Sequence, residues 1–167
     1  MNKLRLFIVT CGFLGCSPFA PGTVGTLGGV AIAWALIGTE PIGTLGGVEI
    51  TLFPVWALLI SAVLYAVGRP LGDWAEQYAG KKDPGIYVLD EVIGYLVTIL
   101  WIDAPSLMTL VVAFFVFRFF DVLKPPLARR AESLPGGDGI LLDDVVAGLH
   151  GLVLMIVARL VLPDLGW

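Results

Sequence analysis

Two adjacent carboxylates, Asp90 and Glu91, stand at the head of an apolar run that continues to Ile102. Because Asp can cap a helix and Pro suits its first position, the preceding pair Asp83–Pro84 predicts that a helix begins there. Gly94 lies four residues after Asp90 on the same helix face, where a missing side chain lets another helix approach. An unpaired buried charge is very costly, so the fold must bring cations or polar groups to these carboxylates.

The composition places this charged pair in an apolar chain. Of the 167 residues, 57% are apolar and 14% are charged, and the mean hydropathy is +0.92. Soluble domains carry about a quarter charged residues, so the chain is typical of a membrane protein. The mild net charge of −4 argues against a nucleic-acid partner. The length predicts a single domain over residues 1–167, and the two cysteines predict neither a zinc site nor a disulfide framework.

Apolar segments divide the chain into helices of different lengths. The sequence predicts an all-α fold, a polytopic membrane helical bundle with about five membrane-embedded helices and a cytoplasmic N-terminus. Two of the segments approach the 18 to 20 residues needed to cross the hydrocarbon core alone, namely the second and the fifth. The five segments are 24–38, 50–68, 86–102, 106–120 and 145–162.

Basic residues predict the orientation of this bundle. Nine of the ten Lys and Arg fall on the side that holds the N-terminus, and the predicted outer segments 39–49, 103–105 and 163–167 hold none. Because cytoplasmic loops are enriched in Lys and Arg, this side is predicted to be cytoplasmic. Most of the acidic residues lie on the same side, so any chemistry is expected at the cytoplasmic face.

A second charged segment ends the fourth apolar helix. Arg118, Asp121 and Lys124 follow one another at intervals of three, just before Pro125 ends the helix. Side chains three apart share a helix face, so these charges are predicted to lie together.

The third charged segment is a predicted glycine-rich loop, residues 136–139, followed by Asp143 and Asp144 at the start of the last helix. Asp144 shares a helix face with Gly148, just as Asp90 shares one with Gly94. The two helices could therefore approach each other closely below the acidic residues. Oxygen ligands without His or Cys suit magnesium, manganese or calcium. The candidate metal ligands are Asp90, Glu91, Asp143 and Asp144.

Cations and backbone amides near these acids suit a phosphate group. Lys124 and Arg118, with Arg129 as a further cation, would form charge-assisted hydrogen bonds to phosphate oxygens. The helix start around Gly22 and Thr23 offers free backbone amides, which favour anions.

Each segment alone also fits a helix end at the membrane interface with snorkelling Lys and Arg side chains. Three such segments on one face favour a functional site, because charges inside a membrane are expensive. His150 is interpreted as a core histidine.

Four blocks, in this order, resemble the phosphatidylglycerophosphatase A family of bacterial membrane phosphatases, and together they span almost the whole chain. This chain has Pro126 and Leu141 where the family often has an aromatic residue and a methionine. The blocks are 20–25, 83–84 with 90–94, 118–125 and 136–148.

The resemblance implies an all-helical fold and magnesium-dependent removal of the terminal phosphate from phosphatidylglycerophosphate, giving phosphatidylglycerol. It places the protein in the bacterial cytoplasmic (inner) membrane, with the phospholipid substrate in the bilayer. Asp90, Asp121 and Asp144 are the candidate catalytic residues. Attack by a metal-activated water and an aspartyl-phosphate intermediate both stay open.

Two other functions remain as alternatives. A CDP-alcohol-type phosphotransferase also places aspartates at a membrane face, although its Asp-Gly…Ala-Arg…Gly…Asp…Asp spacing does not occur here. A non-enzymatic cation carrier would use intramembrane acids along a path, whereas these acids gather at one end.

Overall fold

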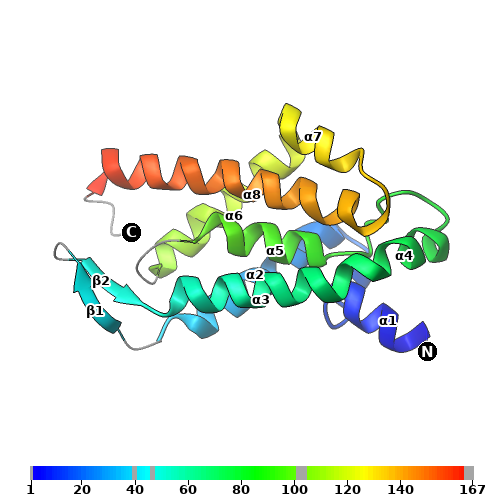
Figure 1. Ribbon diagram of the computed structural model, residues 1–167, viewed down its shortest axis with the longest axis horizontal. Coiled ribbons are helices and arrows are strands. Elements are labelled where there is room, and N and C mark those ends of the chain that lie inside the picture. Colours follow the sequence, from blue (N-terminus) through cyan, green and yellow to red (C-terminus); the bar gives the residue numbers. More distant parts are fainter. Residues whose placement is uncertain (1, 39–40, 46–47, 101–104, 164–167) are drawn as a thin grey trace.

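Long helices run side by side along the molecule, and a short one, α5, lies among them (Figure 1). The computed structural model describes residues 2–38, 41–45, 48–100 and 105–163. The elements in chain order are α1 (Asn2–Val9), the 3-10 helix η1 (Leu14–Cys16), α2 (Pro21–Leu36), β1 (Pro41–Leu45), β2 (Val48–Thr51), α3 (Phe53–Gly68), the 3-10 helix η2 (Arg69–Leu71), α4 (Gly72–Ala79), α5 (Leu89–Thr98), α6 (Leu107–Leu123), α7 (Pro126–Glu132) and α8 (Gly136–Val161).

Helix α5 is the centre of the bundle. Nine of its ten residues are buried, and the exception is the partly buried Glu91. It packs most extensively against α8, and also against α2 and α3. Ten residues of α-helix measure about 15 Å, half the thickness of a hydrocarbon core. Helix α5, which lies within the predicted span 86–102, is therefore too short to cross a membrane alone.

Glycines bring α5 and α8 into backbone contact, as the sequence predicted. A Cβ atom on Gly148 would collide with the carbonyl oxygen of Gly94, and one on Gly94 would lie 2.7 Å from the carbonyl oxygen of Asp144. Thr98 Oγ1 donates a hydrogen bond of 2.9 Å to the same Gly94 carbonyl. The two acidic helix starts are thus held together by close packing directly below the carboxylates.

The prediction that a helix begins at Asp83–Pro84 is wrong. Residues 83–88 form a loop, and α5 begins at Leu89. The amide of Tyr87 closes a turn on the Pro84 carbonyl at 2.8 Å, and the amide of Val88 bonds to the carbonyl of Val9 in α1 at 2.9 Å. These hydrogen bonds use amides that a helix would require, so Asp83 does not cap α5.

The predicted glycine-rich loop is also wrong, because residues 136–139 are the first turn of α8. A Cβ atom on Gly137 would collide with the carbonyl oxygen of Arg69, so glycine lets α8 start against η2. Asp138 then fastens this turn. It accepts hydrogen bonds from Arg69 Nε at 2.6 Å, Arg69 Nη2 at 2.8 Å and the Tyr65 hydroxyl at 2.6 Å.

An antiparallel hairpin of β1 and β2, which the sequence analysis did not predict, joins α2 to α3. Thr44 pairs with Glu49, and a register irregularity lies between Pro41 and Gly43. The hairpin lies at the end of the molecule opposite to α4 and the N-terminus (Figure 1).

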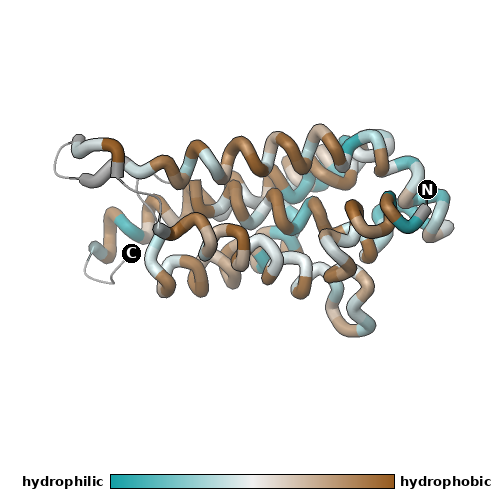
Figure 2. The backbone as a smooth tube through the Cα atoms, turned by 90° about the horizontal axis from the view of Figure 1, so that it is seen from below, coloured by the Kyte–Doolittle hydropathy of each residue, from teal (hydrophilic) through white to brown (hydrophobic). Residues whose placement is uncertain are grey.

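Two helical stretches within the described residues are long and apolar enough to cross a membrane, 53–79 and 136–161. They match the second and fifth predicted segments and fit association with a membrane. Helix α2 is apolar but shorter. Figure 2 shows apolar colours along the helices and hydrophilic ones gathered toward the end that holds the N-terminus. Of the predicted outer segments, residues 39–40, 46–47, 103–104 and 164–167 lie outside the described residues.

Candidate active site

A cavity of about 360 Å³ opens at the end of the bundle where α2, α5 and α8 begin and α6 ends. Because these antiparallel helices bring their starts and ends to one level, charged residues far apart in the sequence face a common space. The lining residues are Ala20, Pro21, Gly22, Thr23, Asp83, Gly85, Tyr87, Asp90, Glu91, Arg118, Asp121, Val122, Lys124, Asp143 and Asp144. Of the residues that the sequence analysis assigned to metal, catalysis or phosphate, all except Arg129 line this cavity.

Asp90, Glu91 and Asp144 form one group of carboxylates in this cavity. One oxygen from each lies within 4.8 Å of the others. Asp90 and Asp144 are buried, and Asp90 Oδ1 accepts a hydrogen bond of 3.0 Å from the Glu91 amide. Glu91 Oε2 is buried without a hydrogen-bond partner. Such an orphaned buried oxygen calls for a cation, so this group fits a metal ion.

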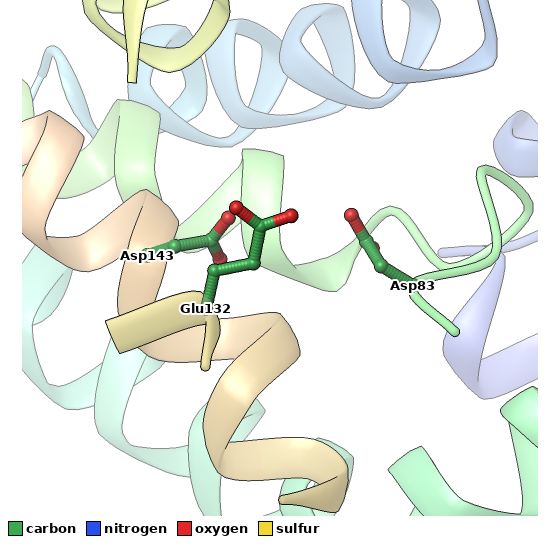
Figure 3. A group of neighbouring side chains, drawn as sticks. All are labelled: Asp83, Glu132 and Asp143. Atoms are coloured by element: carbon green, nitrogen blue, oxygen red, sulfur yellow. The ribbon is translucent and has the colours of Figure 1, made fainter. Parts of the chain in front are cut away.

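Asp143 belongs to a second group, together with Asp83 and Glu132 (Figure 3). The three carboxylates come from α8, the loop 83–88 and α7, and Figure 3 shows them directed toward one another. Lys124 Nζ lies 2.8 Å from Asp143 Oδ2, 3.0 Å from Glu132 Oε1 and 4.0 Å from Asp83 Oδ2. This group therefore already contains a cation of the chain, and the structure separates Asp143 from the other candidate metal ligands.

Within the Lys124 cluster, meaning Lys124 with Asp83, Glu132 and Asp143, the surroundings shift the pKa values of Lys124 and Asp83. Burial alone would lower the pKa of Lys124, but its hydrogen bonds and charge attraction to Asp143 and Glu132 outweigh burial and raise the pKa above the usual value. Burial raises the pKa of the Asp83 carboxyl, and the positive charge of Lys124 opposes that shift. Lys124 stays protonated at neutral pH and holds three chain segments together.

Arg118 and Asp121 form the ion pair that their spacing predicted, with Nη1 and Oδ2 2.5 Å apart. The start of α2 comes close to this pair. A Cβ atom on Gly22 would lie 3.2 Å from Arg118 Nη1 and would collide with Glu91 Oε1. Glycine therefore lets the α2 backbone, with Thr23 beside it, approach these two charged side chains without moving them.

The charges of the cavity are strongly unbalanced. Six carboxylates and two cations line it, which gives the lining a net charge of −4 when all of them are ionised. A phosphate monoester would be repelled by such a surface. One or two divalent cations would offset much of this charge, so bound metal would favour phosphate binding in the cavity.

Sequence reasoning missed one residue of the cavity and one of the second carboxylate group, and it assigned Arg129 a phosphate contact that the structure does not support. Glu132, which belongs to the group around Lys124 and does not line the cavity, carried no signal, because Pro125 interrupts the helix that would have related it to Lys124. Tyr87, whose buried hydroxyl has no hydrogen-bond partner, was also missed. Arg129 does not line the cavity. Its Nε donates a hydrogen bond of 2.8 Å to the Lys124 carbonyl and so supports that residue's backbone.

Comparison with known proteins bears on this site. The model of the phosphatidylglycerophosphatase A family matches residues 7–159. A Bacteroides thetaiotaomicron protein named "Putative phosphatidylinositol-3-phosphatase" is 34% identical over 89% of this chain and 89% of its own length. Proteins named phosphatidylglycerophosphatase A from Haemophilus influenzae and Escherichia coli are 32% and 30% identical, over 93% and 89% of this chain and 88% and 78% of their own lengths. No solved structure matches the chain significantly.

Proposed function

The chain belongs to the phosphatidylglycerophosphatase A family, and we propose that it removes the terminal phosphate of phosphatidylglycerophosphate, leaving phosphatidylglycerol and inorganic phosphate. It is a lipid phosphatase, a phosphoric monoester hydrolase. The observation that carries the choice of reaction is the buried group Asp90, Glu91 and Asp144 in one cavity with Arg118 and Lys124.

We propose magnesium as the cofactor and Asp90, Glu91 and Asp144 as the residues that hold it. Their oxygen-only donor set suits a hard divalent ion, and magnesium commonly combines one or two carboxylates with water and phosphate oxygens. A bound magnesium ion would polarise the phosphoryl group and lower the pKa of a bound water. Asp143, which the sequence analysis grouped with these ligands, is proposed instead to hold Lys124 in place.

Arg118 and Lys124 supply the positive charge for the terminal phosphate in this proposal. Asp121 holds the Arg118 guanidinium, just as Asp143 holds the Lys124 ammonium. The first amides of α2, at Gly22 and Thr23, add donors at the positive end of the helix dipole. Catalysis then rests on positioned charges that stabilise the phosphoryl group as its bond to the lipid breaks.

We also propose that residues 1–167 form a single domain that crosses the bacterial inner membrane several times, with the N-terminus and the cavity on the cytoplasmic side. The uneven distribution of Lys and Arg supports this orientation. The cavity is lined by residues of α2, α5, α6 and α8. The N-terminus and α4 lie at one end of the bundle, opposite the hairpin (Figure 1).

The deciding experiment measures phosphate release by the purified protein in detergent, with magnesium and with excess chelator. We expect release from phosphatidylglycerophosphate that stops when the metal is removed and returns when magnesium is restored. Phosphatidylinositol 3-phosphate is the necessary competing substrate, because one relative carries that name. Faster hydrolysis of that lipid would reassign the substrate, and full activity in chelator would refute the metal site.

The same preparation tests the two alternatives. Transfer of a phosphatidyl group with release of CMP from a CDP-lipid would identify a phosphotransferase. Cation flux into vesicles without phosphate release would identify a carrier. We expect neither activity.

A further inference from the structure

An apolar groove lies between α6 and α8. Most of its residues are on α8, C-terminal to the aspartates that line the charged cavity. Its volume is about 420 Å³, and its lining residues are Phe120, Leu149, His150, Val153, Leu154 and Val157. The five α8 residues recur at intervals of one, three or four, so they form one stripe on that helix. Helices α6 and α8 pack against each other, which makes the groove a seam between two elements.

The same two helices, α6 and α8, contribute to both the groove and the charged cavity, although the two hollows share no lining residue. On α6, Phe120 of the groove directly precedes Asp121 of the cavity. On α8, His150 lies two helical turns after Asp143, roughly 10 Å along the axis. The Phe120 and His150 rings approach to 5.7 Å between centroids, so they close the near end of the groove together.

His150 differs from the interpretation made from the sequence, because it is only partly buried and lines this groove. Its Nδ1 lies 2.7 Å from the Val146 carbonyl and donates to it, which leaves Nε2 for another partner. It is the single ionisable side chain among the groove-lining residues. Lipid headgroup regions are about 5–8 Å thick on each side of a bilayer. In the proposed orientation, with the carboxylates at the membrane surface, His150 would lie near the level of the lipid ester groups.

We propose that this groove binds one acyl chain of the lipid phosphomonoester while its terminal phosphate occupies the charged cavity. The inference rests on the proposed function. A phospholipid has a phosphate, a polar linker and apolar chains in sequence, and the structure presents a charged cavity, a histidine and an apolar groove in the same order.

A second apolar hollow provides the comparison. It lies on α3 and is lined by Trp56, Leu59, Ile60, Val63 and Leu64. No ionisable side chain lines it, and α3 supplies no residue to the charged cavity, whereas α6 and α8 both do. The hollow on α3 therefore has the features of a surface that contacts bulk lipid.

The test fills each hollow with a large side chain. Val153 is 62% exposed and Val63 is 60% exposed, so Val153→Trp and Val63→Trp are matched changes that disturb no buried packing. Each variant is assayed on dioleoyl phosphatidylglycerophosphate and on glycerophosphoglycerophosphate, which has the same headgroup and no acyl chains. We expect Val153→Trp to lower kcat/KM for the lipid at least tenfold and to leave the chainless substrate unchanged, and Val63→Trp to change neither. Equal losses on both substrates, or no loss on the lipid, would overturn the proposal.

A binding experiment separates this proposal from the proposed function. A phosphonate analogue of phosphatidylglycerophosphate, which cannot be hydrolysed, carries a diazirine in one acyl chain and is photo-crosslinked to the protein in phosphatidylcholine vesicles with magnesium. We expect the same phosphonate without the diazirine to suppress labelling of residues 149–157 and not of residues 56–64. Equal suppression of both segments, or of neither, would overturn the groove. If the unmodified protein hydrolyses no phosphomonoester while suppression stays selective, the proposed reaction fails and the groove stands.

Discussion

At the scale of single residues, the cavity depends on carboxylates that outnumber the cations around them. We expect Asp90→Asn and Asp144→Asn each to reduce phosphate release at least a hundredfold, because each removes a charged oxygen from the metal group. The fold should persist, since the amide has the same shape and a buried negative charge is lost. Thermal unfolding in detergent checks the fold. Asp73→Asn, an exposed acid outside the cavity, is the control and should keep full activity.

Lys124 is the residue whose loss should most affect phosphate recognition. Removing one charge-assisted contact usually costs about 1.5–3 kcal/mol, or roughly ten- to a hundredfold in rate. We expect Lys124→Ala and Arg118→Ala to lose activity on this scale, and Thr23→Ala to lose less. Arg159→Ala, near the far end of α8, should be close to neutral. Equal losses in Arg159→Ala and Lys124→Ala would indicate a folding defect instead of lost phosphate binding.

Single residues also show what the sequence can reveal about such a site. Asp90, Glu91 and Asp144 were predictable as neighbours, because a glycine four residues after Asp90 and another four residues after Asp144 allow their helices to approach closely. The role of Asp143 was not, since adjacent helical residues point about 100° apart and one of the pair must face elsewhere. Glu132 meets Lys124 only through the turn into α7, and no periodicity encodes that turn.

At the scale of elements, the contact between α5 and α8 is the one that positions the metal group. Gly148→Ala places a Cβ atom against the Gly94 carbonyl, so the helices must separate. We expect the variant to lose about 1–3 kcal/mol of stability, as overpacked sites do, and to lose activity together with it. The measurements are thermal unfolding and phosphate release. Gly38→Ala, where a Cβ would meet nothing within 4 Å, should leave both unchanged.

Helix positions were largely predictable, and helix starts were less so. Apolar runs located α2, α3, α6 and α8, because their hydrophobic length reflects their surroundings. Asp83–Pro84 looked like a cap, but amides at 87 and 88 bond elsewhere and delay α5 to Leu89. The hairpin 41–51 follows no clear alternation of apolar and polar residues, so its strands gave no period-two signal.

At the scale of the whole molecule, the predicted orientation places every cavity residue on the cytoplasmic side. We expect reporter fusions near Lys81 and Arg130 to report the cytoplasm, and fusions after Asp103 and at Trp167 to report the outer side. The physical reason is the retention of Lys and Arg in cytoplasmic loops. A fusion within residues 130–140 that reports the outer side would contradict a cytoplasmic active site.

The ammonium that three carboxylates share has a consequence for the release of product. Inorganic phosphate leaving the cavity competes with Asp83, Glu132 and Asp143 for Lys124, and these resident anions regain the ammonium as phosphate departs. We therefore expect weak product inhibition by inorganic phosphate. Removing one competitor in Glu132→Gln should lower the inhibition constant for phosphate several-fold, which steady-state kinetics at increasing phosphate concentration would measure. In this enzyme the carboxylates around Lys124 would compete with inorganic phosphate for the ammonium and so favour release of phosphate after each turnover.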